Sequence, residues 1–233
     1  MRGRRRSVGY EVNEIGKNIK AFVASLSAVL AVLVMTFPSF AAETKLNIKP
    51  AELKSMSTFL SNFTELGMMD FETAKLKRAD LIHFGIWHNY INNYHTRIQP
   101  AKDRDREYGD LLIEGKYVSE SIKRYFALDF KEHGAVDDGY HSYYYDGRFY
   151  YLHGADGDAA VHARVKTVCR DASGRLRMAG EVYYPDGQSE ERYGFTALVK
   201  PWKYNGKDTW AILSFKVAKS WYEDMGEGGD DSE

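Results

Sequence analysis

The feature that most constrains the fold is an alternation of apolar and polar residues through the second half of the chain. Val161, Ala163 and Val165 alternate with His162 and Arg164, and this period of two continues to Val217. Short turn pairs separate the alternating segments: Asp146-Gly147, Ser173-Gly174, Asp186-Gly187 and Asn205-Gly206. Such pairs favour tight hairpins, whose turns need positive φ. We therefore predict about six antiparallel strands between Tyr143 and Val217, with one face of the sheet apolar and the other polar.

Three segments before this meander show helical periodicity instead: residues 47–66, 79–98 and 117–126. Pro50 suits the first turn of the first helix, and Gly67 suits its end. Leu111 to Ile113 is predicted to be a short strand. The helices are the natural cover for the apolar face of the sheet. The predicted fold class is α+β, with N-terminal helices packed on one face of a curved antiparallel β meander.

The segment 79–98 is predicted to be the central helix. Asp80 is its expected N-cap, and Pro100 is its expected stop, because the residue before a proline leaves the α region. At about 100° per residue, one face gathers large apolar side chains, which we expect to be buried: Phe84, Trp87, Ile91, Tyr94 and Ile98.

The flank of this face carries amide and imidazole groups beside aromatic rings. That pairing suits a pocket for a polar, partly apolar molecule such as a sugar or a peptide fragment. The candidate ligand-binding residues are Trp87, His88, Tyr90, Asn92, Tyr94 and His95.

Three of these residues, His88, Asn92 and His95, follow i, i+4, i+7 spacing and share one stripe of the helix. A metal or acid–base site is therefore one interpretation, and a helix edge with hydrogen-bonded histidines is the other. The HExxH pattern is absent and a third metal ligand is not evident. We expect neither a metal nor another cofactor.

The ends of the chain differ from its middle. Residues 1–41 combine a basic start, an apolar run and the small residues of Ser39-Phe40-Ala41, which predicts a cleaved signal peptide. An uncleaved N-terminal anchor is the alternative. Residues 223–233 are acidic and Gly-rich, so we expect a disordered tail. The remaining residues, 42–222, are predicted to form one domain in an exported protein, periplasmic or secreted.

Charge and cysteine content exclude several classes of function. The whole chain has 32 basic and 33 acidic residues, and without residues 1–41 it has 26 and 31. A net charge near −5 argues against nucleic acid or an anionic membrane as the main partner. After signal cleavage we expect no stable membrane insertion. Cys169 is the only cysteine, so no internal disulfide can form.

No motif identifies an enzyme class. The stretch from His153 to Asp158 lacks the spacing of a calcium loop, and Cys169 has no catalytic signature around it. The leading hypothesis is a non-catalytic binding module with an aromatic-lined pocket between helix and sheet. The alternatives are a hydrolase-type enzyme using His88 and His95, and a protein-interaction module of the cell envelope. Expected partners are an envelope glycan, a peptide or a protein.

Two resemblances add to this interpretation. The order of elements over residues 48–218 resembles the cystatin-like and NTF2-like α+β folds, which host many unrelated functions. The segments FLSNFTELGMMDFE (59–72) and FGIWHNYINNYHTRI (84–98) resemble those of uncharacterised exported bacterial proteins. The second resemblance implies an envelope or secreted location and brings no activity with it.

Overall fold

The computed structural model describes residues 43–102, 106–154, 160–185 and 191–218. The predicted signal peptide, the acidic tail, the Asp186-Gly187 turn and most of the 153–158 stretch lie outside these residues. The described part is α+β, with antiparallel pairing in every sheet.

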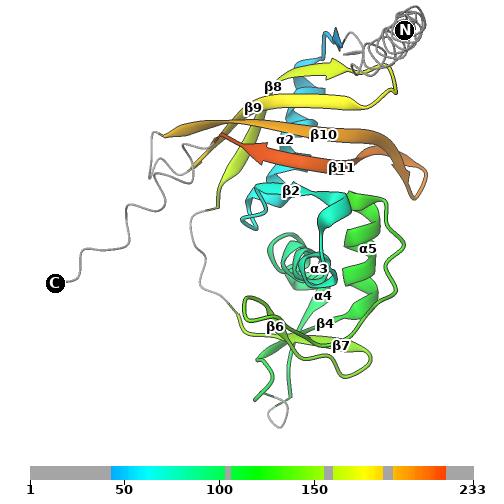
Figure 1. Cartoon of the computed structure of the whole chain (residues 1–233). Coiled ribbons are helices and arrows are strands. Elements are labelled where there is room, and N and C mark those ends of the chain that lie inside the picture. The colour runs from blue at the N-terminus through cyan, green and yellow to red at the C-terminus, as the bar shows by residue number, and fades with distance from the viewer. Residues whose placement is uncertain (1–42, 103–105, 155–159, 186–190, 219–233) are drawn as a thin grey trace, which may run out of the picture. The chain divides into compact units, whose positions relative to one another are not determined.

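The larger sheet has six strands in the order β1-β8-β9-β10-β11-β2. Their bounds are Thr44–Lys45, His162–Arg170, Leu176–Tyr183, Arg192–Tyr204, Lys207–Val217 and Asp70–Glu72. Figure 1 shows the long strands β8 to β11 side by side as a meander. Gly174 and Gly206 both have positive φ, as predicted for their turns. The alternating pattern therefore identified these four strands correctly.

The hairpin at Asp146-Gly147 forms where predicted, but it belongs to other sheets. Strand β7 (Phe149–Leu152) pairs with β4 (Leu111–Glu114), which pairs with β3 (Ile98–Pro100). Strand β6 (Ser142–Tyr143) pairs with β5 (Val136–Asp137). A single continuous meander from Tyr143 to Val217 was therefore wrong. Strand β4, from an earlier part of the chain, provides the backbone partner for β7.

Two of the predicted helices are confirmed, as α2 (Pro50–Thr64) and α5 (Gly115–Phe126), and the third is shorter than predicted. Helix α3 spans Arg78–Asn92, and Asn93 breaks it at φ −136° and ψ 23°. A four-residue helix α4 (Tyr94–Arg97) follows, and Ile98 already belongs to β3. Asp80 lies inside the helix, where its Oδ2 accepts the backbone N–H of Lys77 at 2.7 Å. The N-cap is Lys77, three residues before the predicted Asp80.

The buried face of α3 is also different from the predicted one. Ile91 is 45% exposed and Tyr94 is 40% exposed, whereas His88 and Asn89 are buried. The cause is helix α5, which approaches α3 at Gly85. A Cβ placed on Gly85 would lie only 2.5 Å from Val118 Cγ1. Because α5 also carries polar partners for His88 and Asn89, the polar side of α3 is the side that becomes buried.

Aromatic rings from three helices form the centre of the core. Phe63 of α2 stacks on Phe84 of α3 at 5.1 Å, and Phe126 of α5 meets Phe84 edge-on at 4.9 Å between ring centroids. Hydroxyl groups join α2 to β8. Ser57 and Ser61 accept the backbone N–H groups of Val165 and Ala163, each at 3.0 Å. These hydrogen bonds hold α2 against β8. The 66–72 segment follows α2 and leads to a cleft.

Candidate functional site

A cleft of about 860 Å³ lies between the segment after α2, the start of α3 and the turn between β5 and β6. Its volume falls in the range of small-molecule sites. Apolar and polar groups both line it: Leu66, Gly67, Met68, Met69, Asp70, Phe71, Glu72, Lys75, Leu76, Asp80, His83, Tyr140, His141 and Lys216.

A chain of hydrogen bonds fixes His83 at this cleft. Trp87 Nε1–H donates to the hydroxyl of Tyr143 at 2.6 Å, and the same hydroxyl lies 2.6 Å from His83 Nδ1. An indole can only donate, so the Tyr143 hydroxyl accepts from Trp87, and we assign the hydroxyl proton to the bond with His83. Nδ1 of His83 is then an acceptor, and the proton of the neutral ring sits on Nε2. His83 is therefore held as a fixed N–H donor at the cleft.

His141 stacks on His83 with 4.1 Å between ring centroids and 26° between planes. Its backbone N–H donates to Asp138 Oδ1 at 2.7 Å, which holds the turn that carries it. Its Nε2 lies 4.0 Å from Asp80 Oδ1. The turn between β5 and β6 thus places a second imidazole over the first, next to a carboxylate.

Burial dominates the electrostatics of this cluster. Burial, with a smaller contribution from His141, lowers the pKa of His83 to about 4. Burial also raises the pKa of Tyr143 to about 12. Both groups are uncharged at neutral pH, as the assigned order of donors and acceptors requires.

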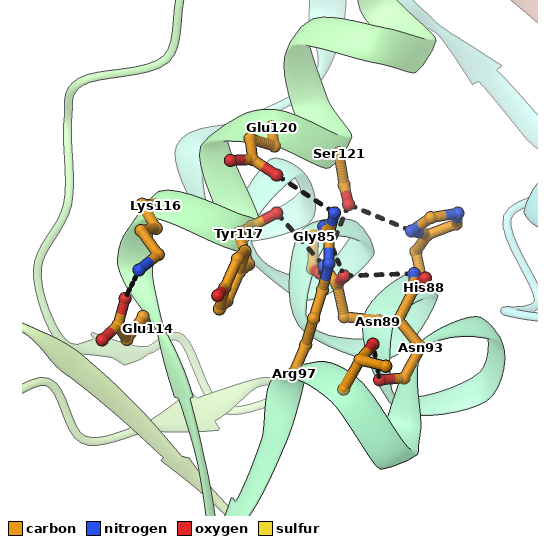
Figure 2. A network of polar contacts seen from close by, with 11 residues as sticks. Gly85, His88, Asn89, Asn93, Arg97, Glu114, Lys116, Tyr117, Glu120 and Ser121 are labelled. Carbon is orange, nitrogen blue, oxygen red and sulfur yellow. Dashed lines mark hydrogen bonds and ion pairs between the residues drawn. The ribbon is translucent and has the colours of Figure 1, made fainter.

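A buried polar network occupies the other side of α3, and Figure 2 shows it. His88 is 3% exposed, its Nδ1 lies 3.0 Å from Ser121 Oγ, and its Nε2 lies 3.1 Å from the Tyr125 hydroxyl. Burial, aided by Arg124 and Arg97, lowers its pKa to about 3. With both ring nitrogens bonded inside the protein, His88 stabilises the α3–α5 contact and has no nitrogen left for a ligand.

Asn89 extends the same network toward the surface. Its Nδ2 donates to Ser121 Oγ at 2.9 Å and to the carbonyl of Gly85 at 2.7 Å. Its Oδ1 accepts from Arg97 Nη1 at 3.0 Å, and Arg97 forms an ion pair with Glu120 at 3.1 Å. The amide thus has partners on both of its polar atoms, which removes the cost of burying it.

The two buried histidines predict a pH dependence of stability. Their folded-state pKa values, about 4 for His83 and about 3 for His88, lie below the ordinary value of 6.5. The unfolded chain therefore binds more protons below pH 6.5, so stability is complete above that pH and falls as the pH drops toward 4. Between pH 7 and pH 5, we expect each histidine to lower the free energy of unfolding by about 1–2 kcal/mol.

Urea unfolding at pH 7, 6 and 5 measures this dependence. His83→Gln should reduce the loss, whereas His95→Gln, at an exposed position, should leave it unchanged. Equal stability of the wild-type protein at pH 7 and pH 5 would contradict the assignment of buried, neutral imidazoles.

The six residues predicted from sequence do not share one pocket wall. Trp87, Tyr90 and Tyr94 do meet, with ring centroids 5.0 Å apart for the first pair and 5.4 Å for the second. Asn92 and His95 are exposed, and His88 points inward. Only Trp87 connects to the cleft, through Tyr143. The sequence pattern singled out neither His83 nor His141 as a candidate site residue.

The part of the chain that the structure describes contains no group of three or more His, Cys, Asp or Glu side chains arranged to hold a metal ion. Cys169 is a free, partly buried thiol in β8. Across the same described residues, no helix has the length and apolar character needed to cross a membrane. Comparison with known proteins finds no matching family model, no matching curated protein and no matching solved structure.

Proposed function

We propose that the protein is an exported, non-catalytic binding module whose ligand site is the cleft beside His83. The observation that carries this proposal is that apolar side chains line the cleft next to the N–H donor of the His83 ring. Met68, Met69 and Phe71 line the cleft next to His83, whose proton is directed by Trp87 and Tyr143. Sites for small molecules combine apolar walls with a few positioned polar groups in this way.

This proposal keeps the predicted class of function and moves the predicted site. Trp87 and Tyr90 of the aromatic flank lie on the same helix, α3, as His83, and Tyr94 begins the short helix α4. Trp87 remains useful because its indole N–H is one hydrogen bond removed from His83. A ligand that disturbs His83 should therefore change the environment of Trp87.

The way in which the helices cover the sheet is the second part of the proposal. We infer that the helices cover one face of the curved meander β8–β11, in an order similar to the NTF2-like and cystatin-like folds. The hydrogen bonds from Ser57, Ser61 and Thr64 of α2 to the β8 segment support the idea. Such folds host many unrelated functions, so the function has to be argued from the cleft itself.

Nuclear magnetic resonance tests the proposed site. We expect short envelope peptides or glycans, titrated into the full chain, to shift the methyl signals of Met68 and Met69 and the indole N–H signal of Trp87. Leu76→Trp should weaken this binding about tenfold or more by filling the cleft, since a tenfold change needs only about 1.4 kcal/mol.

The matched control is Leu128→Trp, because Leu128 is 37% exposed and does not line the cleft. It should bind like the wild-type protein. Ligand-induced shifts confined to Tyr90 and Tyr94 would contradict the cleft assignment and favour the aromatic flank. If no peptide or glycan shifts any of these signals, the interaction-module hypothesis gains instead.

An acid–base enzyme is the second candidate function, and one contact favours it. Asp80 Oδ1 lies 4.0 Å from His141 Nε2 at the cleft, which brings together a carboxylate and an imidazole, two groups that serve in acid–base catalysis. The earlier pair, His88 and His95, is less suitable because both nitrogens of His88 are bonded to α5. Turnover of a bound ligand that is lost in His141→Gln would establish this alternative.

A further inference from the structure

Some of the charged side chains that line the cleft already form ion pairs with each other, and others do not. Glu72 accepts ion pairs from both lysines of the lining, Lys75 at 3.0 Å and Lys216 at 3.7 Å. Lys75 and Lys216 lower the pKa of Glu72 accordingly. The two ammonium groups share one carboxylate, which leaves one positive charge among these three groups, and an anionic ligand would have to compete with Glu72 for both lysines.

The other two carboxylates of the lining have no such partner. Within the described residues, no lysine or arginine forms an ion pair with Asp70 or with Asp80. In the part of the chain that the structure describes, Asp80 lies 4.0 Å from the imidazole of His141 and accepts the backbone N–H of Lys77 at 2.7 Å. With the imidazole of His83 uncharged, as its lowered pKa requires, the cleft has a surplus of accessible negative charge.

Aromatic rings surround the same carboxylate. The stacked pair of His83 and His141 lies beside Asp80, and Tyr140, at 92% exposure, stands at the rim of the cleft. A tyrosine ring attracts a cation over its face. Met68, Met69 and Leu76 contribute uncharged, apolar side chains to the same lining.

We propose that the cleft selects organic cations, namely an amine carried on an apolar body. The ammonium group binds the carboxylate of Asp80 beneath the rim at Tyr140, and the apolar body lies along Met68, Met69 and Leu76. This inference rests on the proposed binding function and names the class of ligand for that site. The acidic balance of residues 42–233, 26 basic against 31 acidic residues, attracts such cations from a distance as well.

Three probes with one body and different head groups test the selectivity: 4-phenylbutylamine, 4-phenylbutyrate and 4-phenylbutanol. Each is titrated into the full chain while the Met68 and Met69 methyl signals are followed. We expect the amine to bind about tenfold or more tightly than the acid, with the alcohol between them, because one ion pair in a partly buried site is worth about 1.4 kcal/mol or more.

Asp80→Asn is the decisive variant, because asparagine keeps an oxygen that accepts the Lys77 N–H and so preserves the start of α3. It should weaken the amine about tenfold and leave the alcohol unchanged. The double variant Lys75→Gln, Lys216→Gln should not weaken the amine. Circular dichroism and thermal unfolding of each variant show whether the fold is retained.

The outcomes separate this inference from the function on which it rests. Equal binding of amine and alcohol, or tighter binding of the acid, would overturn the selectivity for cations and leave the binding cleft in place. If none of the three probes shifts Met68 or Met69 at millimolar concentration, both the selectivity and the proposed binding function are wrong.

Discussion

Replacing Phe84 by alanine should lower the free energy of unfolding by about 3–5 kcal/mol. Its ring is completely buried and contacts Phe63, Tyr125 and Phe126 at centroid distances of 5.1, 5.4 and 4.9 Å. The truncation would leave a cavity between α2, α3 and α5 that this aromatic cluster cannot close. Urea or thermal unfolding of the full chain measures the loss.

Ile91→Asp is the matched control on the same helix. Ile91 is 45% exposed, so an aspartate there should change stability by no more than about 0.5 kcal/mol. The sequence pattern predicts the opposite, that Ile91 is core and its replacement unfolds the domain. If Ile91→Asp unfolds the protein and Phe84→Ala does not, the rotation of α3 described above is wrong.

The second large effect is expected at Gly180 in β9. A Cβ at this position would lie 1.9 Å from the carbonyl oxygen of Arg164 in β8, which is backbone and cannot rotate away. The pairing of β8 with β9 shifts register between Val165 and Thr167, and Val165 is the partner of Gly180, so this irregularity lies beside the glycine. Gly180→Ala should therefore cost about 3 kcal/mol, at the upper end for added volume in a packed interior.

Gly194→Ala in the neighbouring strand β10 is the control for this prediction. A Cβ there would meet no atom within 4 Å, and the residue does not have positive φ. Alanine should then be neutral or stabilise by up to about 1 kcal/mol, because glycine loses more backbone entropy on folding. Equal melting temperatures for the two variants would show that the close approach of β8 to β9 is absent in solution.

Local patterns predict the elements well where one physical cause dominates. The alternation from Val161 to Val217 identifies β8 to β11, and turns at Gly174 and Gly206 confirm the role of positive φ. Pro50 and Gly67 bracket α2 closely. In these segments the backbone preference and the apolar period point to the same structure, so sequence alone is sufficient.

Apolar periodicity could not predict which face of α3 is buried. The pattern assigns Ile91 to the core and Asn89 to solvent, yet Asn89 is completely buried. The missing information is the polar surface of α5, where Ser121 and Tyr125 satisfy Asn89 and His88. Gly85 is the one local signal, because a glycine within a helix favours close approach of another helix.

The candidate site depends on contacts between distant segments, which no local pattern encodes. His83 and His141 are 58 positions apart in the chain, and the β5–β6 turn brings them to 4.1 Å. The sequence pattern gave no reason to place Met68 and Met69 at a site, yet both line the cleft. Trp87, one of the residues predicted to bind a ligand, lies one hydrogen bond away from this cluster, through Tyr143.

A crystal structure of the protein soaked with 4-phenylbutylamine tests the central claim most directly. We predict that the amine nitrogen lies about 3 Å from a carboxylate oxygen of Asp80, with the phenyl ring against Met68, Met69 and Leu76. An empty cleft, with the probe bound instead on Trp87, Tyr90 and Tyr94, would contradict the assignment of this cleft as the ligand site.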